Sequence, residues 1–324
     1  RHFPKDAGSL RKLIDTMIQT YYEVRRFGMD SSLGIRPSMA KMPARYPLML
    51  QAMGMSWAEF MERHIQDSEL QAVFSTMWGY YGLPPSTLNA AAFIFPWVSY
   101  HLFGAYYPQG GSMALSRALE KTVLKYGGEV RYRQTVTEIE MQDGMATAVL
   151  TEKGLRVEAD LIISNANAPD SMLKFVGKEH LPESYSQRVE EALAKPAASN
   201  LVLYLGLDRD LIAEGWTQHE LFLADTYDLE KDYLHVMDGN FEKASMVITH
   251  YNQADPGCTP PGGSILMVMT LAPWDYADQW GTAGDPAALD KNSPTYYHKN
   301  PQYQELKQAA GEALLERVEA VIPG

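Results

Sequence analysis

The feature that most constrains the fold is the stretch from Gly104 to Ala168. After a Gly-Gly-Ser turn at 110–112, Leu115, Leu119 and Val123 recur at the spacing of an amphipathic helix. A Gly-Gly pair at 127–128 is expected to end this helix, because glycine readily adopts the left-handed conformation found at helix C-termini. The stretch therefore begins as a loop that enters a helix.

Short strands are predicted next. Residues 129–133 and 136–141 alternate as strands, and Asp143-Gly144 predicts a tight hairpin turn into a further strand at 145–151, followed by a short one at 155–158. The apolar run at 160–166 predicts a buried strand that leads into a polar loop. A helix, a strand, an antiparallel meander and a return strand are typical of one half of a nucleotide-binding domain.

Several of these motifs together resemble the phytoene desaturase-related flavoproteins, which have an amine oxidase-like fold. The resemblance rests on the run Tyr-Tyr-Pro-Gln-Gly-Gly-Ser at 106–112, the Asp143-Gly144 turn and the Ile-Ile-Ser-Asn-Ala run at 162–166. Within that family the chain is most similar to the carotenoid isomerase and retinol saturase branch. Segments 201–208, 254–256 and 264–274 extend the resemblance over most of the chain.

The family's FAD-binding motif is missing from the sequence. Members begin with a strand, a Gly-x-Gly-x-x-Gly turn and a helix that together hold the FAD pyrophosphate, and no such motif occurs here. We therefore interpret the chain as the central part of an FAD-dependent oxidoreductase. Its FAD site is expected to be incomplete, and the chain alone is expected to be inactive.

The resemblance also implies which residues face the cofactor. The backbone of Val136 would meet the adenine of FAD, and Ser164, Asn165 and Ala166 would end a strand at the edge where open sheets usually bind nucleotides. Two structural alternatives stay open, in which Val136 is only a pleat residue and Asn165 only a turn former.

Residues 86–103 form a dense apolar and aromatic stretch. Core packing is one explanation, and the wall of an apolar tunnel or a lip inserted into lipid is the other. Pro96 is expected to break the helix there. The predicted substrate contacts are Phe93, Phe95, Trp97, Tyr100, Phe103 and Tyr106, together with His250 at the end of a later strand.

The remaining segments predict a domain of helices and antiparallel strands. Helices are expected at 10–27 and 301–321, and strands at 198–207, 220–224, 245–251 and 264–271, forming a sheet with one face available to a ligand. The predicted fold class is α/β, with α+β character in the substrate part: a partial FAD/NAD(P)-binding domain with an antiparallel meander, plus a mixed helical and antiparallel-sheet substrate domain. The expected division is 1–104 and 169–324 for the substrate domain, with 105–168 as the FAD-binding segment.

Charge and composition exclude several classes of function. A net charge of −12 argues against a nucleic-acid partner, which needs clustered Lys and Arg. The first 45 residues are the exception, with nine basic and four acidic residues, so this end could contact an anionic membrane or form a solvated helix face. No apolar run is long enough to cross a bilayer. We expect a cytoplasmic protein with at most peripheral membrane contact.

Other chemistries find little support in the sequence. The histidines show no paired spacing typical of metal ligands, so no metal site is expected. Cys258 is the single cysteine, and it has no adjacent base that would activate it. A nucleophile elbow at Gly110-Gly111-Ser112 fails because Ala114 replaces the last glycine of that motif, so Ser112 is interpreted as a helix cap.

The favoured hypothesis is a flavin-dependent oxidoreductase acting on a long apolar polyene or isoprenoid lipid, by desaturation, saturation or isomerisation. The competing hypothesis is a cofactor-free lipid-binding or protein-interaction module. The sequence assigns no catalytic residue and no oligomeric state.

Overall fold

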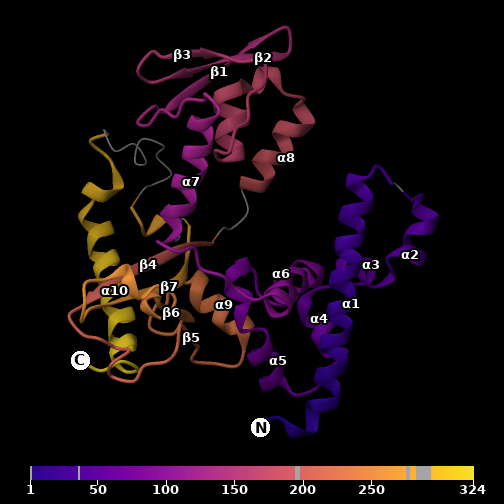
Figure 1. The fold of residues 1–324 in the computed structure, drawn as a ribbon, viewed down its shortest axis with the longest axis vertical. Helices are drawn as coiled ribbons and strands as arrows, with labels where there is room; N and C mark the ends of the chain where they lie inside the picture. The colour runs from indigo at the N-terminus through magenta and orange to yellow at the C-terminus, as the bar shows by residue number, and fades with distance from the viewer. Residues whose placement is uncertain (1, 36, 194–197, 275–277, 282–292) are drawn as a thin grey trace. The chain divides into compact units, whose positions relative to one another are not determined.

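The computed structural model describes residues 2–35, 37–193, 198–274, 278–281 and 293–324. The chain forms two compact units (Figure 1). Arg1–Gly111 and Ala197–Gly324 make up the first unit, and Ser112–Pro196 makes up the second. The two units are described separately below.

The first unit begins with a set of helices. These are α1 (Ala7–Ser32), α2 (Met42–Arg45), α3 (Pro47–Met53), α4 (Trp57–Glu62), α5 (Ser68–Phe74) and α6 (Ala90–Phe103), with the short 3-10 helices η1 (Pro4–Asp6), η2 (Met39–Lys41) and η3 (Thr76–Tyr81). Ser56 and Glu59 form a capping box at the start of α4, and Asp67 caps α5 through the N–H of Leu70.

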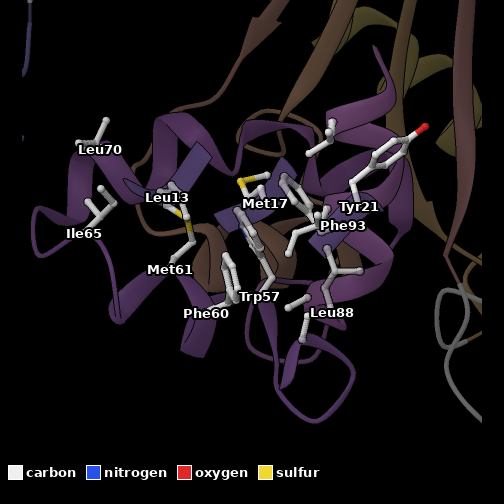
Figure 2. Packing of buried hydrophobic residues seen from close by; sticks show 14 residues of the cluster. Leu13, Met17, Tyr21, Trp57, Phe60, Met61, Ile65, Leu70, Leu88 and Phe93 are labelled. Atoms are coloured by element: carbon white, nitrogen blue, oxygen red, sulfur yellow. The ribbon is translucent and has the colours of Figure 1, made fainter. Parts of the chain in front are cut away.

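These helices pack around an aromatic and aliphatic core (Figure 2). The ring of Phe93 stacks on that of Trp57, with 4.0 Å between centroids. The indole N–H of Trp57 donates to the hydroxyl of Ser75 at 2.7 Å, so the one polar atom of this buried ring has a partner. Leu13 and Met17 of α1 complete the same cluster, which ties the first helix to α4 and α6.

Two predictions about helix ends are wrong here. α1 continues through Gly28 to Ser32, because one glycine costs a helix only about 1 kcal/mol and the flanking turns remain helical. Pro96 lies inside α6 without ending it. The residues on either side of Pro96 hold the helix in place, since Phe93, Ile94 and Val98 are buried in the core.

A four-stranded antiparallel sheet follows, as predicted. Its strands are β4 (Ala198–Leu207), β5 (Glu220–Leu223), β6 (Met246–His250) and β7 (Ser264–Pro273), in the order β4-β7-β6-β5. Two helices, α9 (Leu229–Met237) and α10 (Pro301–Glu319), and the 3-10 helices η6 (Tyr251–Gln253), η7 (Pro256–Cys258) and η10 (Tyr297–Lys299) complete this part. Leu266 and Val268 of β7 pack against Leu314 and Val318 of α10, so this helix covers one face of the sheet.

The second unit contains α7 (Ser112–Lys125) and a three-stranded antiparallel meander. The strands are β1 (Val136–Gln142), β2 (Met145–Thr151) and β3 (Arg156–Glu158), in the order β1-β2-β3. They are followed by the π-helix η4 (Asp170–Gly177), the 3-10 helix η5 (Lys178–His180) and α8 (Glu183–Leu193). Asp143 and Gly144 have φ of +48° and +77°, which confirms the tight hairpin turn predicted between β1 and β2.

Two predicted strands of this unit are not formed. Residues 129–133 and 160–166 are irregular, and within the latter Leu161 and Ile163 are 75% and 84% exposed. An apolar run becomes a buried strand only when neighbouring strands pair with it, and no described strand of the second unit does so. The apolar stripe of α7 is likewise exposed at Leu115, Leu119 and Val123.

Candidate functional site

The face of the four-stranded sheet opposite α10 is the candidate site. Residues of β7 alternate in burial from Ser264 to Ala272: the even-numbered ones are buried, with Leu266 and Val268 packed against α10, and the odd-numbered ones are half-buried on the other face. The register places Val202 of β4 and Val247 of β6 beside Met269, and Phe222 of β5 beside Val247. We call this surface the open sheet face. It consists of Asn200, Val202, Tyr204, Glu220, Phe222, Val247, Thr249, Ile265, Met267, Met269 and Leu271.

Tyrosines from other elements meet the open sheet face. Tyr80 of η3 donates a hydrogen bond to Glu220 at 3.3 Å, and its ring meets Phe222 edge-on at 5.9 Å. Tyr251, directly after β6, donates to the sulfur of Met267 at 3.5 Å and lies 5.7 Å from the ring of Tyr107. Because Glu220 pairs with Thr249 near the end of β6, these contacts place aromatic rings beside the end of the sheet where β5 begins and β6 ends.

These phenols keep their protons over the physiological pH range. Burial, followed by the nearby Glu220, raises the pKa of Tyr80 well above its ordinary value. Burial also raises the pKa of Tyr81 to about 12. The pKa of Tyr251 is raised mainly by burial and then by the neighbouring Tyr107. The site therefore presents neutral hydroxyl groups and apolar rings, an arrangement suited to an uncharged, largely apolar ligand.

A pocket opens at the part of this face nearest η3 and α9. Phe222, Met269 and Leu271 of the sheet line it, together with Trp78 and Tyr80 of η3 and Asp232 of α9. The cavity volume is about 60 Å³, and the space not filled by atoms is about 550 Å³ when the open mouth is included. The cavity has room for a small group or a few water molecules.

The predicted substrate residues lie in different surroundings. Phe93 is fully buried in the helical core, so it offers no surface to a ligand, and Trp97 stacks between Phe74 and His101 on α6. Phe95 and Phe103 lie at the surface and pack on Tyr21 of α1, at 5.0 and 6.1 Å.

Tyr100 is 56% exposed on α6, so a ligand could reach it. Tyr106 is 89% exposed, and its neighbour Tyr107 is the residue that reaches Tyr251.

His250 lies away from the open sheet face. Strand alternation puts its side chain on the same side of β6 as Met246 and Ile248, which pack toward α10. The side chain is 1% exposed, and neither ring nitrogen has a hydrogen-bond partner among the described residues. Burial lowers its pKa, so His250 is held as a neutral imidazole inside the domain.

The residues expected to face the flavin lie in the second unit. Val136 is the first residue of β1, an edge strand of the meander, and such a strand has main-chain groups available along its outer side. Ser164, Asn165 and Ala166 are exposed, and the Ser164 hydroxyl lies 2.6 Å from that of Ser171. A nucleotide could therefore reach Val136 and the run at 164–166, as the predicted contacts with the cofactor require.

Two further features bear on the chemistry. Nowhere in the described ranges do three His, Cys, Asp or Glu side chains gather closely enough to hold a metal ion. None of the described helices is both long and apolar enough to span a bilayer.

The strands at 198–207, 220–224, 245–251 and 264–271 are predicted to form an antiparallel sheet, and this prediction is confirmed. Tyr80 and Tyr81 lie between Gly79 and Gly82, and no local pattern in these residues indicates that Tyr80 packs on a neighbouring sheet. Tyr107, Tyr251 and Phe222 could not be identified in advance, because their proximity depends on pairings between distant strands.

Comparison with known proteins agrees with this architecture. Residues 4–288 match the family described as flavin containing amine oxidoreductase. An oxidoreductase from Methanosarcina mazei has a similar fold, with a TM-score of 0.56, 19% identity, and coverage of 89% of this chain and 61% of that one.

Three relatives of known activity also match. The 4,4'-diapolycopene oxygenase of a Methylomonas species is 29% identical over 70% of this chain and 44% of its own length. A 1-hydroxycarotenoid 3,4-desaturase from Flavobacterium sp. (strain P99-3) is 24% identical over 67% of this chain and 43% of its own. The all-trans-retinol 13,14-reductase of Danio rerio is 23% identical over 80% and 42%, respectively. The chain thus spans less than half the length of these relatives.

The fold and the site define a domain that pairs a helical and antiparallel-sheet part with a segment carrying an antiparallel meander, as in flavin-dependent oxidoreductases. The chain belongs to the flavin containing amine oxidoreductase family, among its phytoene desaturase-related members.

Proposed function

We propose that the chain is the central, substrate-binding part of a flavin-dependent oxidoreductase that acts on a long apolar polyene or isoprenoid lipid. The observation that carries this proposal is the open sheet face, where methionine, aliphatic and tyrosine side chains lie together beside the pocket. Methionine adapts to flexible apolar ligands, and the ring edges of tyrosine pack well against an extended chain. The names of the three relatives refer to substrates of this kind, which supports the assignment.

In this proposal the protein aligns the lipid and the cofactor performs the redox step. FAD, when bound, supplies hydride chemistry for desaturation, saturation or isomerisation of a carbon–carbon bond. The chain's own residues would bind the lipid along the open sheet face, hold it in a fixed register and keep water away from it. Val136, Ser164, Asn165 and Ala166 would contact the nucleotide part of FAD, and residues outside this chain would complete that site.

The lipid part is tested with geranylgeraniol, an isoprenoid alcohol, titrated into the purified chain while tryptophan emission is followed. Replacing two methionines of the open sheet face (Met267→Gln with Met269→Gln) should weaken binding about tenfold, because the apolar contact of both side chains is lost. The matched control replaces two exposed methionines elsewhere (Met53→Gln with Met145→Gln) and should change the affinity less than twofold. Equal affinities of the two double variants, or no binding by the original chain, would contradict the proposal.

The cofactor part is tested by titrating a longer natural protein that contains this chain with FAD and following flavin fluorescence. Asn165→Asp adds a negative charge where the dinucleotide is expected and should weaken binding several-fold. Gln187→Glu makes the same charge change on an exposed face of α8 and should have no effect. If neither this chain nor a longer natural protein that contains it binds FAD, although isoprenoids still bind, the cofactor-free lipid-binding module becomes the better assignment.

We also propose peripheral contact with an anionic membrane, on the cytoplasmic side, through the end of α1 and the segment after it. Met29, Leu33 and Met39 are 59%, 71% and 84% exposed, and the basic residues Arg26 and Lys41 lie nearby in the sequence. The chain should co-sediment with vesicles containing phosphatidylglycerol more than with pure phosphatidylcholine vesicles.

The variant that tests this contact is Leu33→Gln with Met39→Gln, which should sediment less with the anionic vesicles. Its control, Met113→Gln with Leu161→Gln, alters two equally exposed apolar residues of the second unit. The membrane proposal fails if both variants sediment as the original chain does.

A further inference from the structure

The pocket beside the open sheet face contains a buried carboxylate that the proposed function does not use. Asp232 lies on α9, and its side chain is fully buried. One of its oxygens, Oδ1, accepts a hydrogen bond from the backbone N–H of Ser245 at 2.8 Å. The other oxygen, Oδ2, is buried and has no hydrogen-bond partner among the described residues.

Holding a carboxylate in this position is unfavourable for the folded chain. Burial raises the pKa of Asp232, although the hydrogen bond from Ser245 and the nearby Trp78 indole partly oppose that shift. The Trp78 indole does not reach hydrogen-bonding geometry with Oδ2. A purely structural role needs only the acceptor at Oδ1, which an asparagine would supply without a charge. The second oxygen, Oδ2, therefore has no evident part in holding the fold together.

Asp232 lies next to the proposed lipid site. Asp232 lines the same pocket as Phe222, Met269 and Leu271, which belong to the open sheet face. The cavity volume of about 60 Å³ is far too small for a polyene but leaves room for one polar end group of such a molecule. The remainder of an extended ligand would then lie along the open sheet face.

The number of acceptors selects the kind of group. A hydroxyl has one hydrogen to donate, and the single free oxygen of Asp232 can accept it, so neither partner remains unsatisfied. An ammonium group has three hydrogens to donate. The rest of the lining is mostly apolar, with Phe222, Met269 and Leu271 among its residues, so it suits a group with a single hydrogen to donate better than one with three.

We propose that the Asp232 pocket binds the terminal hydroxyl group of an isoprenoid or polyene alcohol and so fixes the register of the chain along the open sheet face. This inference rests on the proposed function and refines its substrate class to lipids with a hydroxyl at one end. Asp232 is a binding residue in this role, at a distance from the reacting carbon atoms.

The test compares geranylgeraniol with its methyl ether, which has the same carbon skeleton and an oxygen that can only accept. At pH 8 the chain should bind the alcohol at least tenfold more tightly than the ether, as measured by tryptophan emission. In Asp232→Asn the amide oxygen still accepts from the N–H of Ser245, and the amide NH₂ group faces the pocket. The oxygen of the alcohol and the oxygen of the ether can both accept a hydrogen bond from this NH₂ group. The preference should therefore fall to less than twofold.

Asp228→Asn is the matched control. Asp228 caps the same helix by accepting from the N–H of Lys231, and asparagine is an equally good cap, so the preference for the alcohol should remain. Retained binding of the ether by Asp232→Asn, with an unchanged near-ultraviolet circular dichroism spectrum, shows that this variant is folded.

The outcomes separate the two proposals. If the original chain binds alcohol and ether equally tightly, the hydroxyl site is refuted and the proposed lipid function stands. If it binds neither, both are refuted. A preference that persists in Asp232→Asn excludes Asp232 as the group that recognises the hydroxyl. The ratio of the affinities of the original chain for the alcohol and for the ether tests the proposal even if the variant does not fold.

Discussion

Phe93→Ala is the substitution for which the structure makes the sharpest prediction. The Phe93 side chain is fully buried, its ring stacks on Trp57 at 4.0 Å, and its centroid lies 5.3 Å from that of Tyr81. Removing the ring takes away its apolar contacts and leaves a cavity that the rigid neighbouring rings cannot fill. The free energy of unfolding should fall by about 3–5 kcal/mol.

Phe95 provides the matched comparison, because it lies two residues further along α6. It is 38% exposed and contacts Tyr21 at 5.0 Å. Phe95→Ala loses mainly this aromatic pair, so the free energy of unfolding should fall by about 1 kcal/mol. The same chemical change on one helix thus gives a large effect on the core side and a small one at the surface.

Urea unfolding followed by far-ultraviolet circular dichroism measures both effects. With a denaturant dependence of about 2–3 kcal/mol per molar, the midpoint should move down by roughly 1–2.5 M for Phe93→Ala and by less than about 0.5 M for Phe95→Ala. Similar shifts for the two variants would refute the placement of Phe93 in the core and would return it to the list of candidate ligand contacts.

Two further predictions concern a helix cap and a buried histidine. Ser56→Ala removes half of the capping box of α4 and should cost about 1 kcal/mol of unfolding free energy, whereas Ser38→Ala, at a helix start where the side chain makes no capping bond, should cost close to nothing in the same urea assay. The pKa of His250 is lowered by burial, so the unfolded chain takes up this proton at a higher pH than the folded chain does. The contribution of His250 to the free energy of unfolding is therefore fully present above the ordinary histidine pKa of 6.5 and is lost as the pH falls below that value. The melting temperature should therefore drop less between pH 7.5 and pH 5.5 in His250→Leu than in the original chain, and an equal drop in both would show that His250 does not contribute to the acid sensitivity.

Local sequence signals predicted local structure well. The helix that follows the Gly-Gly-Ser turn at 110–112 and the hairpin at Asp143-Gly144 each depend on residues a few positions apart, and both are confirmed. The signals failed where the outcome depends on distant partners. The apolar run at 160–166 has the composition of a buried strand but pairs with no described strand of its unit, and Pro96 is tolerated because the buried residues around it outweigh one lost hydrogen bond.

The candidate site shows the same limit. Phe93 and Tyr100 were both predicted as ligand contacts because their stretch is rich in aromatic residues, and composition could not separate the exposed Tyr100 from Phe93, which packs inward. The side of the sheet on which His250 lies depends on the register between β6 and β7, which no single segment reveals. The family resemblance was visible in the turn and strand motifs, and the match over residues 4–288 confirms it.

The alternation within β7 has a consequence for how this protein can diversify. Val268 and Met269 are adjacent in sequence, yet one belongs to the interior under α10 and the other to the surface that we assign to the lipid. Substitutions at 265, 267 and 269 can therefore alter which molecules are accepted with little effect on the interior, whereas those at even positions weaken the interior. Selectivity and stability can then vary separately within one strand, so a library restricted to 265, 267 and 269 offers a direct route to altered specificity.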